Sequence, residues 1–292
     1  MKPARPLRRV AIIGNPNTGK TSVFNALTGL TQKVGNYPGV TVEKKTGLLT
    51  PEIELIDLPG MYSLAAHSPD ELLATRVLLG DYDGEPQPDL VLVIADAGNL
   101  QRNLYLATQV IEVGLPAILV LNMIDTAERH GITVNTRALS RLLGVPVVPT
   151  VAHRRLGVAE LRLAILSTVG SSPPEPLWTL PEPIARERTD LETRFGATGF
   201  ILTRALIDEG GPAERLLEAR WNGDLRTALA DARARIRSSG RSPAALEAEA
   251  RHRWIADALE TTVRREKSRR SLTERVDNVL AHRILGFPIF ML

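Results

Sequence analysis

The chain contains 292 residues, which exceeds one typical domain and predicts about two. Its 43% hydrophobic content is enough for a sizeable core, whereas the 4% aromatic content predicts that this core is mostly aliphatic. The formal charge of +3 is not massed in one basic block, which argues against nucleic-acid binding, and the absence of cysteine excludes disulfides and thiolate metal sites.

The first half of the chain alternates strand-like and helix-like segments. An apolar run at residues 10–13 predicts a buried strand, residues 22–27 have the spacing of an amphipathic helix, and residues 30–41 are predicted to form a loop. Further strands are expected at residues 46–50, 52–56, 90–95, 117–121 and 145–148, and further helices from residue 68, at 103–113 and at 158–169. This alternation predicts an α/β fold over residues 1–170, with a mostly parallel sheet and helices on both of its faces.

The second half changes in composition. Residues 171–183 are rich in proline and predict an extended linker, and residues 184–274 are rich in Ala, Leu, Arg and Glu, which predicts a small all-helical domain. The basic run at residues 264–270 is expected at a solvated helix end. The mostly apolar residues 275–292 fit either a packed chain end or the start of a membrane segment. Because there is no run of about 18 apolar residues, the chain as given is not expected to span a membrane, and residues 1–6 lack the apolar region of a signal peptide.

A glycine-bounded loop follows the first predicted strand and matches the pattern G-x-x-x-x-G-K-[ST]. Because the loop lies between a strand and a helix, its backbone N–H groups are expected to cradle phosphates. Lys20 would reach the β- and γ-phosphates, and the Thr21 hydroxyl would bind Mg²⁺. A chance match is the alternative, and the two correct flanks argue against it. The residues predicted to bind nucleotide here are Gly14, Asn15, Pro16, Asn17, Thr18, Gly19, Lys20, Thr21 and Ser22.

Two shorter motifs complete the predicted phosphate and magnesium site. The first closes a predicted strand, so that Asp57 would hold Mg²⁺ through water and the Gly60 N–H would meet the γ-phosphate. The second contains Thr41, the candidate switch threonine, which is expected to complete the Mg²⁺ shell and to sense the γ-phosphate. The two motifs comprise Asp57, Leu58, Pro59 and Gly60, and Gly39, Val40, Thr41, Val42 and Glu43.

A fourth motif predicts which base is bound. The run Asn122, Met123, Ile124 and Asp125 follows a predicted strand and matches the N-K-x-D pattern of guanine recognition. The Asp125 carboxylate can accept hydrogen bonds from the guanine N1–H and 2-amino groups together, whereas adenine offers no such pair of donors. Met123 replaces the usual lysine and can supply a similar apolar contact to the base. An ordinary helix cap is the alternative, and the order of the motifs favours GTP.

The predicted catalytic residues depart from the common GTPase pattern. Met61 stands where a water-orienting glutamine often stands, and a methionine side chain does not position water. Asn17 offers an amide oxygen beside the phosphates, where a monovalent cation would neutralise developing charge. Lys20, Thr41 and Gly60 are the other predicted catalytic residues. The five histidines are dispersed and are expected on the surface.

These motifs together closely resemble the N-terminal cytosolic part of the ferrous iron transport protein B family. The resemblance is carried most specifically by residues 34–43 and 99–106, and residues 283–290 are similar to the family's entry into its first membrane helix. It implies a Ras-like P-loop GTPase at the cytoplasmic face of the bacterial inner membrane, with GTP and GDP as ligands. GTP hydrolysis with Mg²⁺ would be coupled to Fe²⁺ uptake through a membrane permease domain of the same full-length chain. Small accessory proteins of the iron-uptake system are further implied partners, nucleic acid is not, and formation of a homo-oligomer is left open.

The resemblance also assigns further site residues. It implies a K⁺ site formed by Asn17 and by backbone carbonyls of the loop from Gly35 to Tyr37. The base-binding loop is expected at Val151, Ala152 and His153, where the family usually has Val-Ser-Thr. The Ala152 N–H would meet guanine O6, and the missing serine hydroxyl predicts faster nucleotide release.

Two other functions are compatible with the same motifs. A soluble K⁺-dependent GTPase of the ribosome-assembly or RNA-modifying kind would share the P-loop asparagine, although the helical region shows no obvious RNA-binding patch. A nucleotide-sensing scaffold that turns GTP over poorly would fit Met61. Further long apolar segments in the full-length gene would decide against the soluble GTPase.

Overall fold

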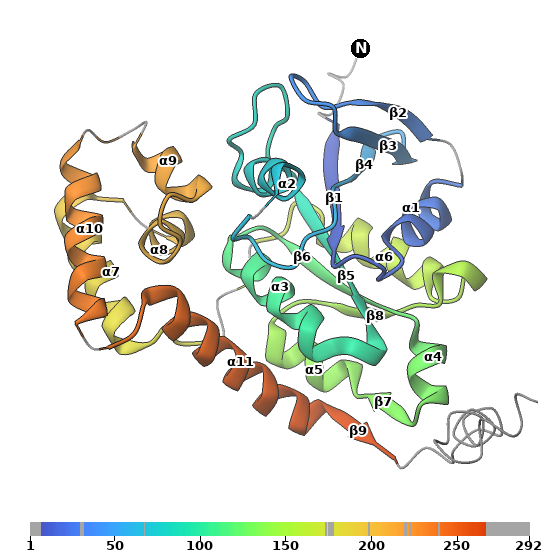
Figure 1. Ribbon diagram of the computed structural model, residues 1–292. Coiled ribbons are helices and arrows are strands. Elements are labelled where there is room, and N and C mark those ends of the chain that lie inside the picture. The colour runs from blue at the N-terminus through green and yellow to red at the C-terminus, as the bar shows by residue number, and fades with distance from the viewer. Residues whose placement is uncertain are drawn as a thin grey trace, which may run out of the picture.

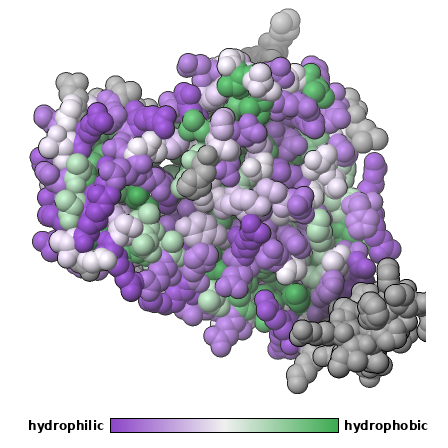
Figure 2. All heavy atoms as spheres, viewed as in Figure 1, coloured by the Kyte–Doolittle hydropathy of each residue, from purple (hydrophilic) through white to green (hydrophobic). Residues whose placement is uncertain are grey.

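The structure is a computed structural model, and it describes residues 7–29, 32–66, 68–172, 174, 178–197, 199–218, 221, 223–238 and 240–266. Figure 1 shows two parts, an α/β part built around a sheet and a helical part beside it. The long helix α11 (Pro243–Thr262) runs from the helical part along the α/β part. The face seen in Figure 2 is mostly hydrophilic, with apolar residues in small scattered groups.

A seven-stranded sheet forms the centre of the α/β part, in the order β2-β3-β4-β1-β5-β6-β8. Strand β1 pairs in parallel with β4 and β5, so the motifs that follow these strands meet at one edge of the sheet. Strand β3 is antiparallel to both of its neighbours. The strands are β1 (Arg8–Gly14), β2 (Gln32–Asn36), β3 (Glu43–Thr50), β4 (Ile53–Asp57), β5 (Leu90–Asp96), β6 (Ala117–Asn122) and β8 (Val147–Pro149).

Helices cover both faces of the sheet, as alternation along β1 requires. Val10 and Ile12 belong to the core cluster that packs against α1 and α6. Ala11 and Ile13 belong to the opposite cluster, which packs against α2, α3 and α5. The helices are α1 (Lys20–Thr28), α2 (Pro69–Leu79), α3 (Leu100–Glu112), α4 (Ile124–Arg129), α5 (Thr136–Leu143) and α6 (Val158–Thr168).

The helical part has a core of its own and returns to the α/β part through α11. Its aliphatic core is formed by α7 (Glu182–Phe195), α8 (Phe200–Ile207), α9 (Pro212–Glu218) and α10 (Gly223–Arg237). Helix α11 packs against α3 and α5, and Ile255 joins the core of the α/β part. The chain then forms β9 (Val263–Arg265), which pairs with β7 (Ile132–Val134) in a separate two-stranded sheet.

Most of the predicted elements are confirmed, and two predictions need correction. Residues 30–41 were expected to form a loop, yet they contain β2, because pairing with β3 extends a polar segment. Arg264 and Arg265 lie in β9 and not at a helix end. Trp178, in the expected linker, is half-buried, with its ring 4.4 Å from the Arg251 guanidinium.

Two further findings concern the membrane. Within the described part of the chain, none of the helices has the length and apolar character needed to cross a bilayer. The expectations for residues 275–292 concern positions outside the described residues.

Candidate functional site

The loop between β1 and α1 has the backbone conformation that its glycines and asparagines permit. Asn17 and Gly19 adopt left-handed φ angles of 66° and 85°. A side-chain carbon on Gly14 would lie 2.4 Å from the Ile94 carbonyl oxygen, so only glycine fits at the end of β1. The Thr18 hydroxyl donates to the Asn15 carbonyl oxygen across 2.9 Å, which closes the loop over the N-terminus of α1.

The segment after β4 lies directly against this loop. A side-chain carbon on Gly60 would be 3.1 Å from Lys20 Nζ, and the Met61 N–H donates to the Gly14 carbonyl oxygen across 3.2 Å. The ammonium group predicted to bind phosphates and the glycine predicted to meet the γ-phosphate are therefore neighbours. Asp57 ends β4, and its Oδ1 atom is buried with no hydrogen-bond partner in the described structure.

The charges of Asp57 and Lys20 are partly removed from water. Burial raises the pKa of Asp57 above its ordinary value, and the positive charges of Lys20 and Lys45 oppose this shift. Burial likewise lowers the pKa of Lys20, opposed by the charge of Asp57. A divalent cation and phosphate oxygens are the groups that would complete such a pair.

Position 61 contributes no polar group to the site. The Met61 side chain is fully buried and belongs to the core cluster beneath α2 and α3. The nearby Leu64 is held by a residue whose role the sequence does not indicate: the buried Gln109 accepts the Leu64 N–H through its Oε1 atom across 2.8 Å. In the sequence, Gln109 is one polar residue within a predicted helix, and nothing there indicates a contact with Leu64.

Asn122, the last residue of β6, connects two loops around the predicted base site. Its Nδ2 donates to the Thr18 carbonyl oxygen across 2.9 Å, and its Oδ1 accepts from the Thr150 hydroxyl at 3.2 Å and the Ala152 N–H at 3.1 Å. The asparagine therefore joins the phosphate loop to the loop after β8. Met123, with a φ of 60°, turns the chain into α4.

Asp125 lies in the first turn of α4. Its Oδ1 atom is buried without a hydrogen-bond partner in the described structure, and its Oδ2 atom is 3.9 Å from Arg129 Nη2. A carboxylate oxygen held out of water in this way favours a ligand that brings a hydrogen-bond donor.

Two predicted site segments are arranged otherwise than the sequence suggested. The Ala152 N–H, expected to meet guanine O6, is donated to Asn122. Gly35 pairs with Lys44 across the β2–β3 ladder, and the Tyr37 carbonyl accepts the Val40 N–H. The backbone expected to bind K⁺ is thus engaged within its own hairpin.

The remaining predicted residues divide by exposure. Both threonines predicted to bind Mg²⁺ are exposed to solvent. The full set of exposed residues among these is Pro16, Asn17, Thr21, Ser22, Gly39, Val40, Thr41, Glu43 and His153. Those that are half-buried or buried are Val42, Leu58, Pro59, Ile124 and Val151.

The family of the chain follows from comparison with known proteins. A family model described as ferrous iron transport protein B matches residues 8–165. The chain belongs to this family. It is 37% identical, over 314 aligned residues, to a Porphyromonas gingivalis protein named as a fusion of Fe²⁺ transport protein A and the Fe²⁺ transporter FeoB. That match covers 100% of this chain and 36% of the relative.

A second relative agrees with the first. The Fe²⁺ transporter FeoB of Escherichia coli O157:H7 is 38% identical over 293 residues, which cover 97% of this chain and 37% of the relative. The chain therefore spans little more than a third of the length of these curated relatives.

Solved FeoB structures confirm the predicted fold, a P-loop GTPase domain followed by a helical region. The cytosolic domain of Legionella pneumophila FeoB is 35% identical with a TM-score of 0.73, and the match covers 88% of this chain and all of that one. A variant of the Streptococcus thermophilus domain bound to GDP is 32% identical with a TM-score of 0.77, covering 88% and 99%. The Thermotoga maritima domain in a GMPPNP form is 30% identical with a TM-score of 0.72, covering 88% and 100%.

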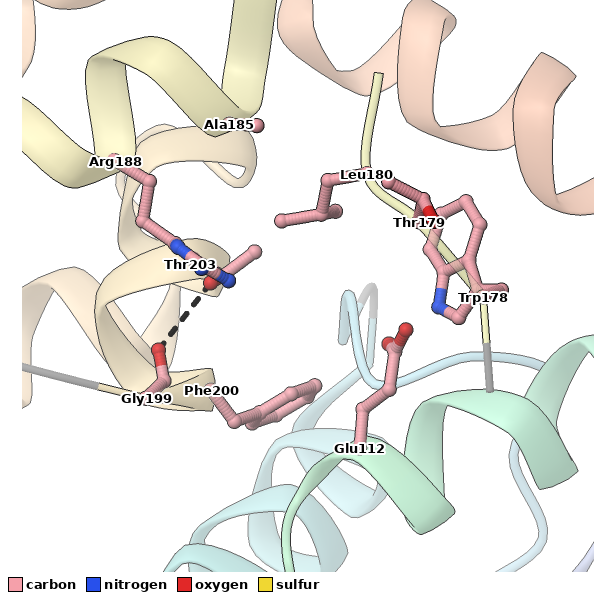
Figure 3. A pocket seen from close by; sticks show the side chains of 9 residues that line it. All are labelled: Glu112, Trp178, Thr179, Leu180, Ala185, Arg188, Gly199, Phe200 and Thr203. Carbon is pink, nitrogen blue, oxygen red and sulfur yellow. Dashed lines mark hydrogen bonds between the residues drawn. The ribbon is translucent and has the colours of Figure 1, made fainter. Parts of the chain in front are cut away.

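A cavity of about 420 Å³ lies away from this site, between the two parts of the molecule. Figure 3 shows the Glu112 carboxylate directed into it, with Trp178 and Phe200 on its walls. The cavity adjoins the contact between α3 and α11 and has no residue in common with the candidate nucleotide site.

Proposed function

We propose that the chain is the GTP-binding and GTP-hydrolysing part of a bacterial Fe²⁺ transporter. The observation that carries this proposal is the Asp125 carboxylate, which follows β6 with one buried oxygen free to accept from guanine. The adjacent Lys20 and Gly60 supply the phosphate end of the same site. Support comes from the S. thermophilus and T. maritima relatives, whose structures contain GDP and are described in a GMPPNP form.

Each residue of the site has a defined task in this proposal. Lys20 balances the charge of the β- and γ-phosphates, and the Gly60 N–H donates to the γ-phosphate. Mg²⁺ would be held by Thr21, by Thr41 and, through water, by Asp57, and when bound it would neutralise phosphate charge. The buried Asp57 oxygen without a hydrogen-bond partner in the described structure fits this role. Because Met61 is buried and carries no polar group, the side chain at position 61 does not orient the attacking water.

The rest of the transporter would lie outside this chain. We infer a GTPase domain at residues 1–170, a linker at 171–183, a helical domain at 184–274 and a membrane-entry segment at 275–292. The names of the P. gingivalis and E. coli relatives support Fe²⁺ as the transported ion. A permease domain of the same full-length chain, at the inner membrane, would carry the Fe²⁺, and small accessory proteins and a second copy of the chain are further proposed partners.

Nucleotide selectivity tests this function directly. Titration of the purified chain with GDP and with ADP, in the presence of Mg²⁺, is expected to give binding of GDP alone. Equal affinity for ADP would contradict the assignment of Asp125 to guanine recognition.

We further propose that K⁺ stimulates hydrolysis through Asn17. GTP turnover is expected to be at least about tenfold faster in KCl than in NaCl of the same concentration, because a cation beside the phosphates offsets developing charge. The change Asn17→Ala is expected to remove this difference. Equal wild-type turnover in the two salts would contradict the proposal.

A further inference from the structure

Tyr37 occupies a position that its local sequence does not explain. The five residues of β2 before it are all exposed, yet the Tyr37 side chain is only 1% exposed and belongs to the core cluster under α2 and α3. Its ring meets that of Tyr82 edge-on with the ring centres 6.1 Å apart, and Lys44 Nζ lies 5.7 Å from its ring centre. The end of β2 is therefore docked onto the body of the protein by one large aromatic side chain.

The docking site is the turn between α2 and β5, at residues 82–85. The Tyr82 hydroxyl donates to the Pro38 carbonyl oxygen across 2.6 Å. Glu85, with 3% side-chain exposure, forms an ion pair with Lys44 from β3 and a second with Arg9 at 3.0 Å. A buried carboxylate with a cation on each side fixes its partners in place, because removing one partner leaves an uncompensated charge.

These contacts hold the hairpin that carries the predicted switch residues. The Tyr37 N–H donates to the Val42 carbonyl oxygen across 3.0 Å, and the Tyr37 carbonyl accepts from Val40 across 3.3 Å. Thr41, between them, is exposed to solvent. The Tyr37 carbonyl oxygen, which is predicted to bind K⁺, thus accepts a hydrogen bond within the docked hairpin.

We propose that the docking of Tyr37 and Pro38 onto the turn at residues 82–85 is a latch that must open before GTP is held in its reactive arrangement. This inference rests on the proposed function. In the proposed function Thr41 would bind Mg²⁺ when a triphosphate is held, whereas the docked hairpin leaves Thr41 exposed to solvent. A diphosphate would not need Thr41. Only molecules with an open latch would hold the triphosphate, so the apparent affinity for the triphosphate is scaled down by the fraction of molecules in which the latch is open. The affinity for GDP is not affected.

The change Tyr82→Phe tests the latch with little disturbance elsewhere. It keeps the ring that packs against Tyr37 and removes only the hydrogen bond to Pro38. One hydrogen bond of ordinary strength corresponds to about a fivefold change in the open-to-closed ratio. The affinity for GMPPNP is expected to rise by about fivefold in the intact chain, and the affinity for GDP to stay unchanged.

The change Tyr37→Phe is the matched control, because the Tyr37 hydroxyl is buried without a hydrogen-bond partner in the described structure. Removing a buried, unpaired hydroxyl leaves the latch as tight as before or tighter. GMPPNP affinity in this variant is therefore expected to equal or fall below that of the wild type. A rise similar to that of Tyr82→Phe would overturn the latch.

Amide hydrogen exchange in the nucleotide-free protein measures how often the latch opens. The amides of Tyr37 and Val40 are expected to exchange about fivefold faster in Tyr82→Phe than in the wild type, and not faster in Tyr37→Phe. Wild-type exchange and wild-type GMPPNP affinity in Tyr82→Phe would overturn the inference. If the wild type bound neither GDP nor GMPPNP, the proposed function would fail, while the exchange result would still support or overturn the latch.

Discussion

The change Asp125→Asn is expected to lower the affinity for GDP by at least about 100-fold. The carboxylate would accept two hydrogen bonds from guanine, and a hydrogen bond to a charged group contributes roughly 1.5–3 kcal/mol. The amide of asparagine places an N–H donor opposite a guanine donor, so that one pair is lost and the other is weakened. Isothermal titration with GDP measures the loss.

The same substitution predicts a gain for another base. Xanthine has a carbonyl at C2 where guanine has an amino group, so the asparagine amide would donate where the carboxylate had accepted. Asp125→Asn is therefore expected to bind xanthosine diphosphate more tightly than GDP. Retention of GDP binding, or failure to gain xanthosine diphosphate, would place the base elsewhere than at Asp125.

A matched control lies on the same helix. Glu128 is an exposed carboxylate in α4, one turn after Asp125. The change Glu128→Gln removes the same charge without touching the predicted base contact, so GDP affinity is expected to remain within about twofold of the wild type. A large loss in this variant would mean that the net charge of α4 determines affinity, and not the position of one carboxylate.

The phosphate loop could be predicted from sequence because its determinants are local. Gly14 and Gly19 have no room for a side-chain carbon, and the apolar run of β1 and the helical spacing of α1 lie on either side of them. The family comparison identifies the same region, since residues 8–165 match the family model. Strand–loop–helix order is visible in any sequence that carries such a pattern.

Strand β2 could not be predicted in the same way. Gln32–Asn36 is mostly polar and exposed at every position, and its extended conformation comes from pairing with β3 and from the burial of Tyr37. Both are tertiary effects, which outweigh local propensity. A tertiary contact also explains why the partner of the Ala152 N–H was not predicted, since the accepting Asn122 lies 30 positions earlier in the chain.

The contact between the helical part and the α/β part could not be predicted from the sequence either. Helix α11 contains Arg251 and Arg253, and the sequence offers no means of telling the buried arginine from the exposed one. The partners of Arg251 on α3 are Thr108 and Glu112, 143 and 139 positions away. Contacts of such separation leave no periodic signal in either segment.

The change Arg251→Met is expected to destabilise the folded chain by about 3–5 kcal/mol. The Arg251 side chain is 1% exposed, and its guanidinium bonds to Thr108 at 2.8 Å, to Glu112 at 2.6 Å and to Glu247 at 2.6 Å. Methionine keeps most of the apolar volume, but it removes the ion pair of the buried Glu112 and leaves Glu247 with only the longer pair to Arg204, at 3.5 Å. Urea unfolding, followed by circular dichroism, measures the difference.

Arg253 provides the control within the same helix. Its side chain is 70% exposed, and the structure gives it an ion pair with Glu249 at 3.0 Å. Because exposed ion pairs contribute little, Arg253→Met is expected to change stability by less than about 1 kcal/mol. Similar losses in the two variants would show that arginine's effect on the helix itself, and not the buried contact with α3, determines stability.

The dependence of the Arg251→Met deficit on pH distinguishes uncompensated charge from lost packing. Burial raises the pKa of Glu112, and the positive charge of Arg251 opposes that shift, so removing the arginine raises the pKa further. A carboxyl whose pKa is higher in the folded than in the unfolded state destabilises the fold above its folded pKa, and this cost disappears as falling pH protonates it. The deficit relative to the wild type is therefore expected to be smaller near pH 5 than near pH 8. A deficit of equal size at both would assign it to packing around Trp178, whose ring lies 4.4 Å from the guanidinium.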